Sequence, residues 1–88
     1  MLTRHAEIRC QQRGIRPEVV ATLLAYGRRE RRHGADVCFM DRDAHRRAER
    51  DLGRKTYARL SDRLGTYLVV GDDGQVITAA PRLGRMRI

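Results

Sequence analysis

Residues 67–80, YLVVGDDGQVITAA, contain the clearest structural signal in the chain. Two short apolar runs, Tyr67–Val70 and Val76–Ala80, flank the tetrapeptide GDDG at 71–74, and Pro81 follows the second run. Apolar runs that flank a Gly/Asp turn are typical of a β-hairpin, and a proline ends a strand because it has no N–H to donate. The sequence therefore predicts an antiparallel hairpin here.

A second hairpin is predicted upstream of the first. The chain is basic from Arg28 to Arg32, turns at His33 and Gly34, and continues with the apolar run VCFM at 37–40. Two interpretations stay open for the basic strand, because charged side chains both protect an edge strand from aggregation and bind phosphate. The residues concerned are Arg28, Arg29, Arg31 and Arg32.

Helices are predicted before and between the hairpins. Thr3 suits the N-cap of a helix that ends near Arg13, and Pro17 suits the start of a second, more apolar helix that ends before Gly27. A third helix is expected over 42–52. The periodicity of 54–64 does not decide between a helical turn and an irregular segment, and His45 is given no specific role.

This order of elements predicts the fold class. The expected fold is α+β, with two N-terminal helices, then a four-stranded antiparallel sheet covered on one side, and a helical insertion between the two hairpins. A chain of 88 residues is too short for two domains, so residues 1–88 are expected to form a single domain.

The charge of the chain points to an anionic partner. The net charge is +8, and Lys55 is the one lysine among 19 basic residues. Coding bias toward GC explains the preference for arginine over lysine, but it explains the excess of base over acid less readily. A basic protein attracts polyanions, so RNA or another nucleic acid is the leading partner class.

Several other classes of protein are disfavoured by the sequence. Cys10 and Cys38 have no Cys or His at zinc-ligand spacing, so both are expected to be buried free thiols. The glycines do not have the spacing of a nucleotide-binding loop, and no apolar run is long enough for a membrane span. We therefore expect a cytoplasmic protein with no metal, no cofactor and no membrane partner.

The best lead to function lies near the start of the chain. At about 100° per residue, His5, Arg9, Gln12 and Arg13 fall within one narrow arc of a helix. Arginine binds phosphate through paired donors, and histidine can transfer protons near neutral pH. The cluster indicates a phosphate-handling surface. The alternatives are a structural hydrogen bond for His5, and ion pairs of Arg9 and Arg13 with nearby carboxylates such as Glu7, Glu18 and Asp36.

Three segments carry a family resemblance: HAEIRCQQRGI at 5–15, LLAYG at 23–27 and YLVVGDDGQVITAAPR at 67–82. Together they resemble a family of small bacterial proteins, domain-of-unknown-function family 4258. That family is similar to the RelE and barnase-like ribonuclease toxin architecture, in which N-terminal helices precede a four-stranded antiparallel sheet that holds RNA in a basic cleft.

The resemblance implies metal-independent RNA cleavage. In such relatives a base activates the ribose 2′-hydroxyl, an acid protonates the leaving oxygen, and basic groups stabilise the transition state. By this resemblance His5 is the acid or base, and Arg9 or Arg13 is the electrophile. Thr78 and Arg82 match the closing pattern of the family. By the resemblance they are secondary candidates for nucleic-acid binding.

Three functions follow from these observations. The first is a RelE-like endoribonuclease of the toxin type. The second is a non-catalytic module that binds RNA or DNA. The third is a protein-interaction domain whose basic face docks a small acidic partner, such as an antitoxin.

Overall fold

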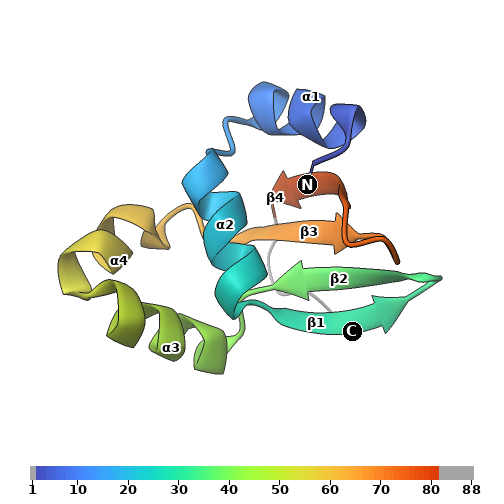
Figure 1. Ribbon diagram of the computed structural model, residues 1–88. Helices are drawn as coiled ribbons and strands as arrows, with labels where there is room; N and C mark the ends of the chain where they lie inside the picture. The colour runs from blue at the N-terminus through green and yellow to red at the C-terminus, as the bar shows by residue number, and fades with distance from the viewer. Residues whose placement is uncertain (1, 82–88) are drawn as a thin grey trace.

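The computed structural model describes residues 2–81 and has the predicted α+β architecture, with four helices and one four-stranded antiparallel sheet in this range (Figure 1). Two helices precede the sheet and two lie between its hairpins. In chain order the elements are α1 (Arg4–Arg13), α2 (Pro17–Tyr26), β1 (Arg28–Arg32), β2 (Ala35–Phe39), α3 (Arg42–Leu52), α4 (Arg54–Ser61), β3 (Thr66–Val70) and β4 (Val76–Pro81).

The sheet has the strand order β1-β2-β3-β4, so β1 and β4 are its edges. The turn between β1 and β2 lies at His33 and Gly34, whose φ angles of 50° and 81° match the left-handed turn that a two-residue hairpin requires. Residues just before α1 cover the β4 edge, where Leu2 forms a parallel bridge to Val76. The basic strand β1 is therefore an edge strand, as the sequence predicted.

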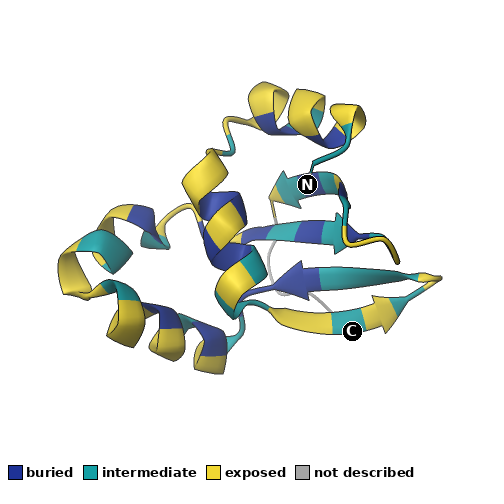
Figure 2. Ribbon diagram, in the orientation of Figure 1, coloured by how far each residue is buried: buried dark blue, intermediate teal, exposed yellow. Residues whose placement is uncertain are grey.

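The core lies between α2 and one face of the sheet. Val19 and Leu23 of α2 are fully buried, as are Leu68 of β3 and Ala79 of β4. Side chains alternate between the two faces of a strand, and buried and half-buried residues alternate along β3 in this way (Figure 2). The apolar face of α2 thus fixes which face of the sheet is covered.

Local signals explain the ends of α1 and α2. The Thr3 hydroxyl accepts a hydrogen bond from the Ala6 N–H at 3.1 Å, and Gly14 closes α1 with a φ of 65°. Pro17 occupies the first turn of α2, where its missing N–H costs nothing. These caps confirm the predicted boundaries and bring Arg13 to the exposed end of α1.

The insertion between the hairpins consists of two helices, α3 and α4. The segment after Gly53, which the sequence left undecided between a helical turn and an irregular segment, is thus helical. Asp41 caps α3 by accepting from the Ala44 N–H at 2.8 Å. The assignment of no role to His45 was wrong, because its Nδ1 lies 2.9 Å from the Tyr57 hydroxyl of α4. This contact joins residues twelve positions apart, which no local pattern encodes. Within residues 2–81, none of the helices has the length and apolar content needed to cross a membrane.

Candidate functional site

The predicted cluster on α1 forms a row along one side of that helix. We call His5, Arg9 and Arg13 the α1 row; they recur every four residues, and Arg9 Nε lies 3.5 Å from His5 Nε2. Ala6 and Cys10 are buried and lie on the flank of the helix next to the row. The α1 row therefore runs beside the core-facing flank of α1, with His5 and Arg13 exposed and Arg9 half-buried.

Arg13 also contacts the sheet. Its Nη1 donates a hydrogen bond to the carbonyl oxygen of Ala79 on β4 at 2.9 Å. This contact uses one of the five N–H donors of the guanidinium and leaves the others available. Arg13 therefore stands at the junction between the end of α1 and the edge of the sheet, with its position fixed by a backbone group.

No carboxylate neutralises the two arginines of the α1 row. Ion pairs of Arg9 and Arg13 with acidic side chains were one interpretation of the sequence, but neither arginine forms one with any residue among 2–81. Glu7 lies on the opposite side of the helix, about 200° from His5 at 100° per residue. Within this range no carboxylate compensates the positive charge of the α1 row.

Within the described residues, three of the arginines of β1, unlike those of the α1 row, form ion pairs with carboxylates. Arg28 pairs with Glu30 at 3.1 Å and with Asp41 at 3.6 Å, and Arg32 lies 4.0 Å from Glu30. Arg31 pairs with Asp72 at 2.7 Å, and the hydrogen bond and charge of Asp72 raise the pKa of Arg31. Exposed ion pairs contribute little stability, but any phosphate that binds these arginines must compete with a carboxylate.

The remaining predicted contacts are not brought to the α1 row. Arg29 lies opposite Cys38 in the β1–β2 register. Thr78 is half-buried and lies opposite Val69 of β3, and it alternates with the core-facing Ala79. Its side chain therefore faces the surface of the sheet that does not pack against α2. Arg82 lies outside the described residues.

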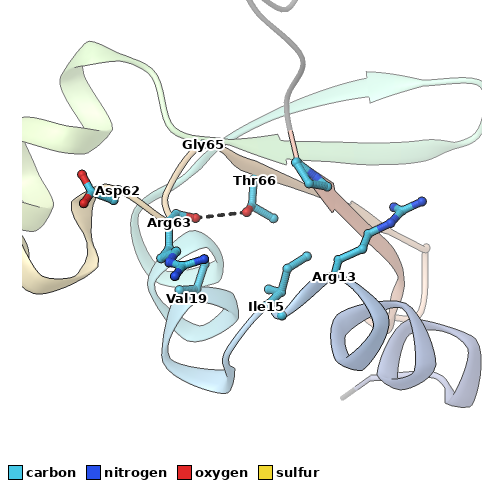
Figure 3. Close-up of a pocket in the computed structure, with 9 residues that line it drawn as sticks. Arg13, Ile15, Val19, Asp62, Arg63, Gly65 and Thr66 are labelled. Atoms are coloured by element: carbon cyan, nitrogen blue, oxygen red, sulfur yellow. Dashed lines mark hydrogen bonds between the residues drawn. The ribbon is translucent and has the colours of Figure 1, made fainter.

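A cavity of about 140 Å³ adjoins the end of the α1 row. It lies between the α1–α2 loop and the connection from α4 to β3. Figure 3 shows Arg13 and Arg63 on opposite sides of this cavity, with Ile15 between them. Its lining residues are Arg13, Gly14, Ile15, Val19, Asp62, Arg63, Gly65, Thr66 and Pro81.

Arg63 was missed as a candidate from the sequence. Its backbone is held by Thr66, whose hydroxyl donates to the Arg63 carbonyl oxygen at 3.0 Å and whose side chain is buried (Figure 3). Arg63 is exposed and forms no ion pair within residues 2–81. The signal that was available is a spacing of four residues among Lys55, Arg59 and Arg63.

The cysteines do not supply a nucleophile to this region. Burial raises the pKa of the Cys10 thiol, and burial is also the main cause that raises the pKa of Cys38, against the opposing charge of Arg29. Both thiols are therefore protonated at neutral pH and unreactive. Both are buried and free, as expected. No three His, Cys, Asp or Glu side chains of residues 2–81 are grouped as metal ligands.

Comparison of this chain with protein-family models, with curated proteins and with solved structures finds no match.

Proposed function

We propose that this protein binds the phosphodiester backbone of a nucleic acid through the α1 row. One observation carries the proposal: Arg9 and Arg13 stand in line on one face of a helix with no carboxylate partner among residues 2–81. Planar guanidinium groups bind phosphate oxygens through paired hydrogen bonds. The family resemblance of the sequence makes RNA the expected nucleic acid.

The overall charge supports the same partner class. A net charge of +8 attracts a polyanion and, on binding, releases the counterions condensed along its backbone. The gain in binding free energy is largest where a basic side chain has no carboxylate partner to give up. The α1 row meets this condition, whereas Arg28, Arg31 and Arg32 of β1 do not. The proposed surface therefore leaves out these three arginines of β1.

A salt titration tests the proposal. The wild-type protein is expected to bind a 12-nucleotide single-stranded RNA with an affinity that falls steeply between about 50 and 200 mM salt. In the variant Arg9→Gln/Arg13→Gln, the slope of log affinity against log salt is expected to fall by about 1.4, because each phosphate contact to a single strand contributes about 0.7. Binding is measured by fluorescence anisotropy.

Arg28→Gln/Arg31→Gln is the matched control, since it removes the same charge from arginines that are already paired. Its salt slope is expected to equal that of the wild type. A DNA strand of the same sequence distinguishes recognition of RNA from recognition of any phosphodiester. Absence of binding by the wild type, or equal losses in the two double variants, would contradict the proposal.

A second candidate function is RNA cleavage, and the contact between His5 and Arg9 favours it. Arg9 Nε donates toward the lone pair of His5 Nε2 at 3.5 Å, and that lone pair would serve as a base once Arg9 turns from it to a phosphate. Removal of the proton of a ribose 2′-hydroxyl would let its oxygen attack the adjacent phosphorus and expel the 5′-oxygen, which takes a proton from solvent. Arg9 would then stabilise the charge on the phosphoryl oxygens.

A further inference from the structure

A second group of basic side chains lies on α4 and just beyond its end. Lys55 and Arg59 are on α4 and Arg63 follows its last residue by two positions; we call these three residues, spaced by four in the sequence, the α4 row. All three are exposed, and none forms an ion pair within residues 2–81. On α3, Arg46 pairs with Asp43 at 3.9 Å and Arg50 pairs with Asp51 at 3.3 Å, whereas Arg42 and Arg47 form no ion pair within residues 2–81.

Contacts with α3 and with the core hold α4 in place. Tyr57 joins α4 to α3 through the hydrogen bond with His45, and the two rings meet edge to face at 87°. Arg47 of α3 donates in turn to the carbonyl oxygen of Tyr26 at the end of α2, at 3.1 Å. On its inner side α4 buries Leu60 in the core. The basic groups of α4 therefore keep a defined position relative to the core.

The α4 row ends at the cavity where the α1 row also ends. Arg63 lines one side of the cavity and Arg13 lines the other (Figure 3). Asp62 is the one acidic residue among those that line it, and no ion pair joins Asp62 to either arginine. The two rows are thus adjacent at this point, although the residues that form them are about fifty positions apart in the sequence.

We propose that the nucleic-acid surface continues from the α1 row across this cavity onto the α4 row, so that a single strand is held by both. This inference rests on the proposed function, because it extends the same surface. The longest dimension of the fold is 33 Å, which limits the strand to about 10 stacked nucleotides at about 3.4 Å each. The partner is a strand long enough to reach from the α1 row to the α4 row, bound through its backbone.

The test compares two triple variants that lower the net charge equally, from +8 to +5. Lys55→Gln/Arg59→Gln/Arg63→Gln removes the α4 row, and Arg28→Gln/Arg31→Gln/Arg32→Gln removes three paired arginines of β1. With the 12-nucleotide RNA, the salt slope is expected to fall by about 2 in the first variant and to stay unchanged in the second. Thermal unfolding monitored by circular dichroism checks that each variant is folded.

A second pair of variants does not depend on the stability of α4. A Cβ at Gly65 would meet no atom within 4 Å, so Gly65→Asp places a carboxylate at the cavity without steric conflict. We expect it to weaken RNA binding at least several-fold, whereas His33→Asp, which adds a carboxylate at the exposed turn between β1 and β2, binds as the wild type does. This pair decides the matter if the α4 triple variant does not fold.

The outcomes separate this inference from the proposed function. If the wild type binds no nucleic acid, the proposed function fails and the inference with it. If Arg9→Gln/Arg13→Gln weakens binding while the α4 triple variant and Gly65→Asp do not, the α1 surface stands and its extension is wrong. Equal losses in the two triple variants would show a general charge effect and would also overturn the extension. Wild-type binding to an acidic protein alone would refute both.

Discussion

Replacement of Gly27 by alanine is expected to destabilise the protein by about 3 kcal/mol. Gly27 connects α2 directly to β1, and a Cβ at this position would lie 2.4 Å from the Leu23 carbonyl oxygen and 2.7 Å from Cys38 Sγ. The same Cβ would lie 3.2 Å from the Phe39 carbonyl oxygen. Two of these three atoms belong to the backbone and cannot turn aside, so α2 must separate from the sheet.

The measurement is thermal unfolding, in which the midpoint is expected to fall by roughly 12–24 °C for a domain of this size. Gly65→Ala is the matched control, because its Cβ meets no atom within 4 Å and its backbone has no left-handed φ. That variant is expected to unfold at the wild-type temperature. A Gly27→Ala protein as stable as the control would show that α2 does not approach β2 as closely as described.

Replacement of His5 by alanine is expected to separate cleavage from binding, if the protein is an endoribonuclease. Loss of a group that transfers protons lowers the rate of RNA cleavage by about 10²–10⁴-fold. RNA affinity is expected to change little, because the phosphate contacts are assigned to arginines. Cleavage is followed on the 12-nucleotide RNA, whose product should carry a 2′,3′-cyclic phosphate, and a strand with 2′-deoxyribose should remain intact.

His33→Asn is the control for this experiment. His33 is exposed at the hairpin turn with a φ of 50°, a conformation that asparagine tolerates well. Its cleavage rate should match that of the wild type. A His5→Ala protein that cleaves at the wild-type rate would exclude His5 from the reaction, and a wild type that binds RNA without cleaving it would leave binding as the sole function.

Most of the fold was predictable because its signals are local. The N-cap at Thr3, the left-handed Gly14, Pro17 in the first turn of α2 and the turn at His33-Gly34 each act within a few residues. Short-range chemistry of this kind can be read from one sequence. Residues 54–61 were undecided because their helical period spans barely two turns, and packing of Leu60 against the core decides the matter.

The candidate site was predictable only in part, because its electrostatics depend on distant residues. The spacing of His5, Arg9 and Arg13 placed them correctly on one side of a helix. The sequence could not show that Arg31 meets Asp72, about forty positions away, while Arg9 meets no carboxylate within residues 2–81. Nor could it show that Arg63 lies across a cavity from Arg13. Which arginines remain available for phosphate is therefore a property of the tertiary structure.

In the proposed function, nucleic acid binds the α1 row rather than the paired arginines of β1. The most direct test is an NMR titration of ¹⁵N-labelled protein with the 12-nucleotide RNA, in which the side-chain Nε–H signals of the arginines are followed. We expect the signals of Arg9 and Arg13 to shift as RNA is added, while those of Arg28 and Arg31 stay in place. Shifts confined to Arg28 and Arg31, with Arg9 and Arg13 unchanged, would contradict the proposed function.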